Sequence, residues 1–93
     1  MHNLHIWKTV TDEGEKREVR AVKFAGAWKI QAKLKSQDLW TYYEVPLLED
    51  LRELHDVLFR KYQRRRAAYE DVVLIERMLK KREREDTESA DAK

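Results

Sequence analysis

The chain has 93 residues, of which 42% are hydrophobic and 41% charged, so it can form one modest core and is too short for several large domains. Its 20 Lys and Arg nearly balance its 18 Asp and Glu, and a net charge of +2 argues against binding of nucleic acid or membranes by bulk charge alone. The absence of cysteine excludes disulfides and thiolate metal sites.

The first predicted strand covers residues 4–10, which are rich in apolar, β-branched and aromatic side chains, and a turn follows at residues 11–16. We expect this strand to form a hairpin whose apolar side chains share the core face. The pairs that satisfy this condition are Ile6 with Val22 and Leu4 with Phe24.

Residues 22–34 alternate between apolar and polar side chains with a period of two, which is typical of a strand with one buried face. Gly26 interrupts the run, so it forms either one long bent strand or two strands joined by a three-residue loop at residues 25–27. Both alternatives put the same apolar side chains on the core face: Val22, Phe24, Trp28, Ile30, Ala32 and Leu34.

A turn at residues 35–38 precedes the last predicted strand, residues 39–45. Pairing Leu34 with Leu39 fixes the register of this hairpin. On the core side the register sets Ile30 opposite Tyr43 and Trp28 opposite Val45. On the other face it sets Lys33 opposite Trp40, Gln31 opposite Tyr42, and Lys29 opposite Glu44.

Pro46 ends the sheet, and residues 47–84 contain no Gly, no Pro and no turn cluster. We therefore expect one helix of ~50 Å at 1.5 Å per residue, with a break near residues 61–66 as the alternative. The predicted fold class is α+β, an antiparallel three- or four-stranded β-meander followed by a long C-terminal α-helix. One domain would cover residues 1–84, with the sheet at 4–45, and residues 85–93 would be a disordered polar tail.

A continuous helix would outrun the sheet, because a seven-residue strand spans only ~23 Å. The sheet would then cover one leucine stripe, Leu47, Leu51, Leu54 and Leu58. The next apolar segment, residues 68–79, would form an exposed patch of a kind that monomers rarely tolerate. We therefore expect a non-enzymatic interaction module that forms a homodimer, or docks to a protein partner, through Ala68, Val72, Val73, Ile75, Met78 and Leu79. Folding back as a helical hairpin is the alternative.

The second functional hypothesis is a nucleic-acid-binding accessory protein. Its first candidate surface is the basic cluster of Arg60, Lys61, Arg64, Arg65 and Arg66. Its second is the sheet face with Lys29, Lys33, Trp40 and Tyr42, where aromatic rings can stack bases and lysines can hold phosphates. The simpler interpretation of both is a solvated helix collar and ordinary cross-strand packing.

The sequence has no glycine-rich phosphate loop, nucleophile motif or paired-acid cleft, so we expect no enzymatic activity, no cofactor and no small-molecule substrate. His2 and His5 point to opposite faces of a strand, and His55 lies apart on the helix, so we expect no metal site. The longest apolar run, residues 72–75, is far short of the ~20 residues that span a bilayer. The N-terminus lacks a signal-peptide pattern, and we expect a cytoplasmic protein with no membrane contact.

Overall fold

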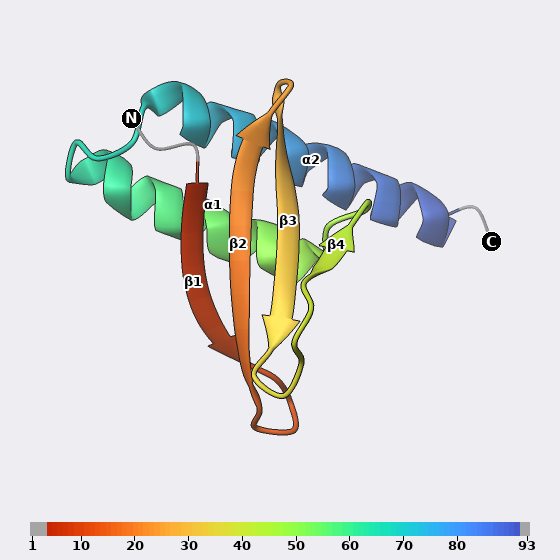
Figure 1. Cartoon of the computed structure of the whole chain (residues 1–93). Coiled ribbons are helices and arrows are strands. Elements are labelled where there is room, and N and C mark those ends of the chain that lie inside the picture. The colour runs from red at the N-terminus through yellow and green to blue at the C-terminus, as the bar shows by residue number, and fades with distance from the viewer. Residues whose placement is uncertain (1–3, 92–93) are drawn as a thin grey trace. The chain divides into compact units, whose positions relative to one another are not determined.

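The computed structural model describes residues 4–91, which form four strands and then two helices (Figure 1). The elements are β1 (Leu4–Val10), β2 (Lys16–Phe24), β3 (Ala27–Leu34), β4 (Thr41–Tyr43), α1 (Leu48–Gln63) and α2 (Tyr69–Asp91). This confirms the predicted α+β class and its antiparallel meander, in the four-stranded form. The chain divides into two compact units, a sheet unit that ends at Pro46 and a helical unit that begins at Leu47. The assignment of residues 1–84 to one domain stays a prediction.

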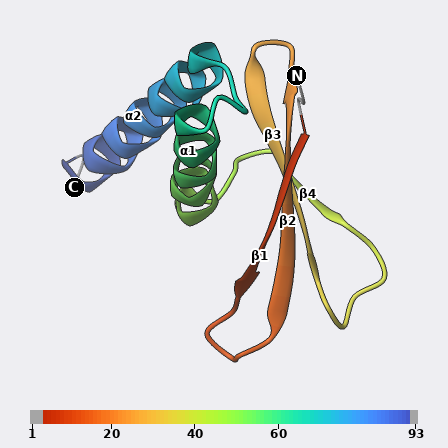
Figure 2. The same cartoon turned by 90° about the vertical axis from the view of Figure 1, so that its left-hand side faces the viewer.

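The sheet has the strand order β1-β2-β3-β4, with every neighbouring pair antiparallel, and its strands form one twisted layer (Figures 1 and 2). The turn between β2 and β3 has two residues, Ala25 and Gly26, with φ angles of 53° and 75°. Positive φ at both positions is the geometry of a tight turn that matches the twist of the flanking strands. The predicted alternative of two strands is therefore confirmed and the single bent strand is wrong. The connection is one residue shorter than the predicted three-residue loop.

This shorter turn changes which residues share a face, because side chains alternate along a strand. Val22 pairs with Lys29 and Ala21 pairs with Ile30, so Val22 lies on the opposite face from Ile30. The buried face carries Val19, Ala21, Trp28, Ile30 and Ala32. The prediction that Val22 and Phe24 belong to the core face is wrong.

The first hairpin is shifted by two residues from its predicted register, and an even shift does not change which side chains share a face. Leu4 pairs with Val22 and Ile6 pairs with Arg20, so both β1 residues follow Val22 onto the exposed face. His5 and Trp7 pair with residues of the buried face, and His5 itself is buried.

The last hairpin confirms its predicted register. Ile30 pairs with Tyr43 and Gln31 pairs with Tyr42. The strand is shorter than predicted, since β4 covers only Thr41–Tyr43 instead of residues 39–45. The outer predicted pairs therefore lie beyond the ladder: Leu34 with Leu39, Lys33 with Trp40, Lys29 with Glu44, and Trp28 with Val45.

In the helical unit, the predicted continuous helix is wrong and the alternative break is correct in kind. Helix α1 ends at Gln63, and the N–H of Arg66 donates to the carbonyl of Lys61 (2.7 Å) while that of Arg65 donates to Tyr62 (2.9 Å). These two bonds are those of a Schellman motif, whose left-handed position is usually Gly. Here Arg65 takes that position, with φ of 59°. The sequence signal of a helix end is therefore missing although the helix ends.

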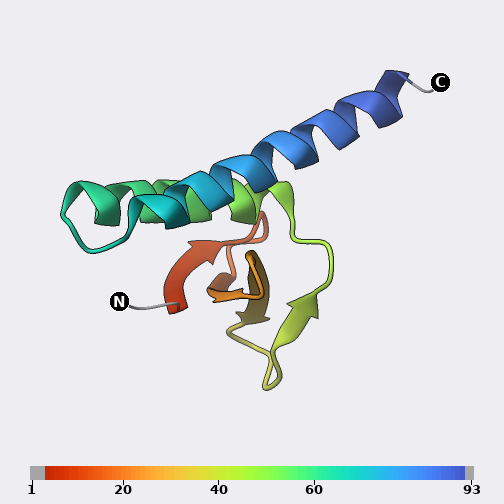
Figure 3. The same ribbon diagram turned by 90° about the horizontal axis from the view of Figure 1, so that it is seen from above.

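The two helices form an antiparallel hairpin, as Figure 3 shows from above. Two contacts fix the direction, because the rings of Tyr62 and Tyr69 lie 5.5 Å apart and Nε2 of His55 lies 3.4 Å from Glu76. From the first contact to the second, the α2 residue number rises by seven and the α1 residue number falls by seven, so the helices run in opposite directions. Helix α2 continues to Asp91, so helical backbone replaces the predicted disordered tail over residues 85–91, and residues 92–93 lie outside the described part. Neither described helix combines the length and apolar content that a bilayer crossing needs.

Candidate nucleic-acid interface

The face of the sheet opposite the buried one is called the open face here. Three of its rows of side chains, which run across the sheet, connect three or more strands. They are Leu4, Val22 and Lys29; Ile6, Arg20, Gln31 and Tyr42; and Lys8, Glu18 and Lys33. Lysines, an arginine and an aromatic ring therefore come together from all four strands.

The middle row is held together by Arg20. Its Nε donates a hydrogen bond of 2.9 Å to the side-chain oxygen of Gln31. Its guanidinium carbon lies 4.1 Å from the ring centroid of Trp40, which is a cation–π contact. Because Arg20 points to the open face, Trp40 reaches this face although it lies outside β4.

The aromatic side chains of the open face are accessible to solvent. Tyr42 is 50% exposed and Phe24 is 68% exposed, while Trp40 is half-buried under Arg20. Exposed rings on a strand surface can stack against the planar faces of unpaired bases. The open face therefore has the parts of a stacking platform.

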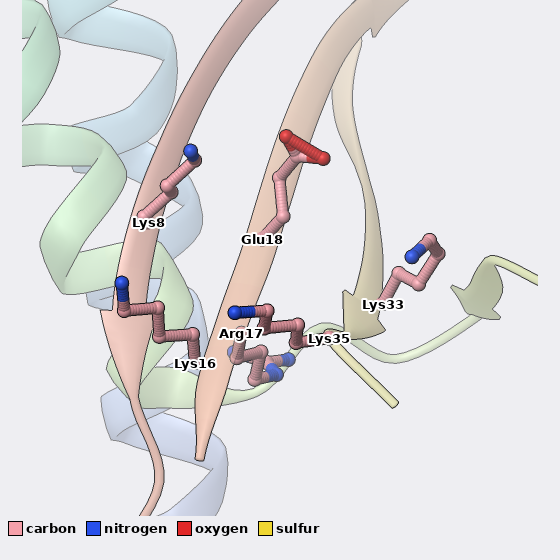
Figure 4. A pocket seen from close by; sticks show the side chains of 6 residues that line it. All are labelled: Lys8, Lys16, Arg17, Glu18, Lys33 and Lys35. Carbon is pink, nitrogen blue, oxygen red and sulfur yellow. The ribbon is translucent and has the colours of Figure 1, made fainter. Parts of the chain in front are cut away.

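A basic hollow lies at one end of the open face, where β1 and β3 end and β2 begins (Figure 4). It has a volume of about 240 Å³, and its open-face side chains are four lysines around one glutamate, Lys8, Lys16, Lys33, Lys35 and Glu18. Arg17 also lines it, but its guanidinium donates to the hydroxyl of Tyr43 (3.3 Å), a residue of the opposite face. The lysines and Glu18 give the hollow a net formal charge of +3, which favours anions.

An acidic turn borders the basic hollow. Glu15 accepts a hydrogen bond of 3.0 Å from the N–H of Ser36, which ties the β1–β2 turn to the turn after β3. The Ser36 side chain and its backbone N–H both lower the pKa of Glu15 below its usual value by bonding to the carboxylate. Glu15 lines an adjoining hollow together with Lys16 and Lys35.

The structure brings together one of the two predicted nucleic-acid surfaces. Its four residues, Lys29, Lys33, Trp40 and Tyr42, all belong to the open face. The residues that sequence reasoning missed are Lys8, Lys16, Glu18 and Arg20. Their signal is the strand register, which places them beside Lys33 and Gln31 once the two-residue turn is known.

The predicted basic cluster lies in the helical unit, around the turn between the helices. Arg64, Arg65 and Arg66 are exposed there, and Lys61 is half-buried. Arg60 is already paired, since its guanidinium lies 3.3 Å from Asp56 one helical turn earlier. This cluster and the open face therefore belong to different units of the chain.

The predicted protein interface has a different environment from the expected one. Val72 is 2% exposed and Ile75 is 0% exposed, and the other predicted members are half-buried, Ala68, Val73, Met78 and Leu79. The chain does not form the uninterrupted helix with a bare apolar half from which this interface was predicted. Self-association through residues 68–79 stays a prediction. The fully exposed apolar patch that led to this prediction is not present, because the side chains predicted to form it are buried or half-buried.

The histidines do not form a cluster in the described part of the chain. The ring of His5 packs edge-on against Trp28 with 5.4 Å between centroids, and His55 lies beside Glu76 on the helical hairpin. His2 lies outside the described residues. Among the side chains that the structure describes, those of residues 4–85, no group of three or more His, Asp or Glu is placed to hold a metal ion.

Comparison with known proteins finds no match to the chain among protein-family models, curated proteins or solved structures. The open face with its basic hollow is therefore interpreted from its own chemistry.

Proposed function

We propose that this protein binds single-stranded nucleic acid on the open face of its sheet. The observation that carries the proposal is the placement of exposed aromatic rings and a basic hollow on one face of one sheet. Rings can stack bases of any sequence, while lysine ammonium groups neutralise the phosphates between them. The predicted cytoplasmic location is part of this proposal.

A single strand suits this face better than a duplex. Duplex recognition needs an element that enters a groove, usually a helix or a two-stranded ribbon. A flat sheet surface with accessible rings instead requires bases whose planar faces are free. Tyr42 and Phe24 are therefore useful only to an unpaired strand.

The net charge of +2 agrees with a local interface of modest strength. Because the lysines are concentrated on one face, the attraction acts at short range and is sensitive to salt. We expect dissociation constants in the range of about 10⁻⁴–10⁻⁶ M near physiological salt, which is typical of sequence-independent binding.

The experiment measures fluorescence anisotropy of labelled single-stranded and double-stranded oligonucleotides at several salt concentrations. The test variant, Lys29→Ala with Lys33→Ala, removes two cations from the open face. Since each phosphate contact on a single strand contributes about 0.7 to the salt slope, the double variant should reduce that slope by about 1.4.

The matched control is Lys80→Ala with Lys81→Ala, which removes the same charge from exposed positions of α2. The proposal expects the control to bind nearly as well as the parent chain. No binding of single strands at low salt, or equal losses in the two double variants, would contradict it.

A further inference from the structure

The charge of the basic hollow exceeds what one internal phosphate of a nucleic acid needs. An internal phosphodiester carries a single negative charge, whereas the open-face side chains of the hollow carry a net +3. A terminal phosphate is a monoester, with a charge of about −1.5 to −2 at pH 7 and three strong acceptor oxygens. Four lysines that line one hollow match that ligand better.

The position of the hollow also indicates an end of the bound strand. The Lys8–Glu18–Lys33 row lies next to the row of Tyr42, two residues or about 6–7 Å further along the strands. Beyond it, Glu15 lines the adjoining hollow together with Lys16 and Lys35.

The turn past Glu15 is acidic as well. Asp12 and Glu13 line a third hollow together with Glu15. A polyanion that follows the open face toward this turn would meet three carboxylates, and like charges repel. The chain of phosphates is therefore expected to stop at the basic hollow.

From these observations we infer that the basic hollow binds the terminal phosphate of a single-stranded nucleic acid. The inference rests on the proposed function, because the open face holds the nucleotides that follow the phosphate. Lys16 and Lys35 lie at the end of the hollow that is farther from Tyr42. Only a phosphate at the end of the nucleic acid would interact with these two positive charges. We expect the hollow to prefer either the 5′ or the 3′ end of the nucleic acid, because the aromatic rings extend from only one side of the hollow.

Glu18 limits the strength of this site. Its carboxylate lies in the row between Lys8 and Lys33, where it offsets part of their charge. A bound phosphate would be repelled by that carboxylate at short range. Replacing Glu18 by glutamine therefore strengthens binding of the terminal phosphate, and a gain in affinity cannot result from misfolding.

The experiment compares three versions of one internally labelled oligonucleotide, with a 5′-phosphate, a 3′-phosphate or neither. The parent chain should bind one of the phosphorylated versions about tenfold more tightly than the version without phosphate. The variant Lys16→Ala with Lys35→Ala should lose this preference, because its affinity for the phosphorylated strand should fall about tenfold further than its affinity for the unphosphorylated strand. Glu18→Gln should increase the preference several-fold, and the control Lys80→Ala with Lys81→Ala should leave it unchanged.

The outcomes separate this inference from the proposed function. Equal binding of all three oligonucleotides overturns the terminal-phosphate site and leaves the function standing. The site is also overturned if Lys16→Ala with Lys35→Ala weakens all three oligonucleotides by the same factor, because the hollow would then bind internal phosphates. If none of the three oligonucleotides binds at low salt, the proposed function itself fails.

Discussion

The two faces of the sheet carry similar side chains in different surroundings. Each face carries a tryptophan, and the surroundings of the two rings differ. Trp28 is 1% exposed and packs against the edge of His5. Trp40 lies under the guanidinium of Arg20 on the face that also carries the lysines. The first ring contributes to the core, and the second belongs to the face that we propose binds nucleic acid.

This difference depends on the length of one turn. Because Ala25 and Gly26 form a two-residue connection, the β2 side chains that share a face with Trp28 are Val19, Ala21 and Lys23. A three-residue loop would have put Val22 and Phe24 there instead, and Arg20 with them. Alternation within each strand defines two faces, but the turn decides how the faces of successive strands combine.

The largest expected effect is on stability and separates the two faces directly. Replacing Trp28 by alanine removes a large buried side chain and leaves a cavity, which should cost about 3–5 kcal/mol. Phe24→Ala is the comparison, and because Phe24 is 68% exposed, it should change stability by no more than about 0.5 kcal/mol. Urea denaturation measures both values. Similar losses in the two variants would mean that Phe24 belongs to the core and that the assignment of the faces is wrong.

The next effect is on binding and uses two neighbouring tyrosines of β4. Tyr42 belongs to the open face, and Tyr43 pairs with Ile30 of the buried face. Tyr42→Ala should weaken binding of a single-stranded oligonucleotide by about 1–3 kcal/mol, the usual contribution of one stacked base. Tyr43→Ala should leave affinity unchanged once the folded fraction is confirmed by circular dichroism. A stronger effect at Tyr43 would contradict the assignment of the interface.

A smaller effect concerns the turn that sets the faces. Alanine at position 25 is strained because its φ is 53°, and a left-handed residue other than Gly or Asn costs about 1–2 kcal/mol. Ala25→Asn creates the preferred Asn-Gly turn and should stabilise the fold by about 0.5–1 kcal/mol in thermal or urea denaturation.

Gly26→Ala is the control for Ala25→Asn and should have the opposite effect on stability. A Cβ at position 26 would meet no atom within 4 Å, so its cost comes from the backbone conformation alone, with φ of 75°. It should therefore destabilise the fold. Stabilisation by Gly26→Ala, or destabilisation by Ala25→Asn, would contradict the two-residue turn.

The smallest effect is a pH dependence of the folding stability, which arises from Glu15 beside the basic hollow. The pKa of Glu15 is lowered, first by the Ser36 side chain and then by its backbone N–H, from an ordinary value of 4.5. The ionised carboxylate of Glu15 stabilises the fold, because its pKa is lower in the folded chain than in the unfolded chain. This contribution to stability is fully present above the unfolded pKa and is lost as the pH falls through the folded pKa. Ser36→Ala should raise the pKa of Glu15, which carboxyl NMR titration measures. An unchanged pKa in this variant would show that the side-chain hydrogen bond does not form.

The sequence predicted the α+β class, the meander and the register of the last hairpin because strong local signals favour them. Pairing of Ile30 with Tyr43 follows from alternation on both sides of an unambiguous polar turn. The first two hairpins could not be placed the same way. Ala25 in a left-handed conformation has no sequence signature, and the apolar residues of β2 lie on both faces, Val19 on one and Val22 on the other.

The helix break could not be located for a comparable reason. Arg64, Arg65 and Arg66 are acceptable within a helix, and propensity alone favours continuation there. Tertiary packing overrides that preference, since the hairpin buries Val72 and Ile75 at the cost of one left-handed arginine. The shared face of Lys29, Lys33, Trp40 and Tyr42 was still predicted, because these residues come from the hairpin whose register was correct.

The most direct test of the proposed interface observes the tryptophan side chains during binding. The chain has three tryptophans, of which Trp7 and Trp28 point to the buried face and Trp40 to the open face. Titration with a single-stranded oligonucleotide, followed by NMR of the three indole N–H signals, reports each face separately. The proposal expects the Trp40 signal to shift with saturation while the Trp28 signal stays in place. Saturable shifts of Trp28 or Trp7 with no change at Trp40 would contradict it.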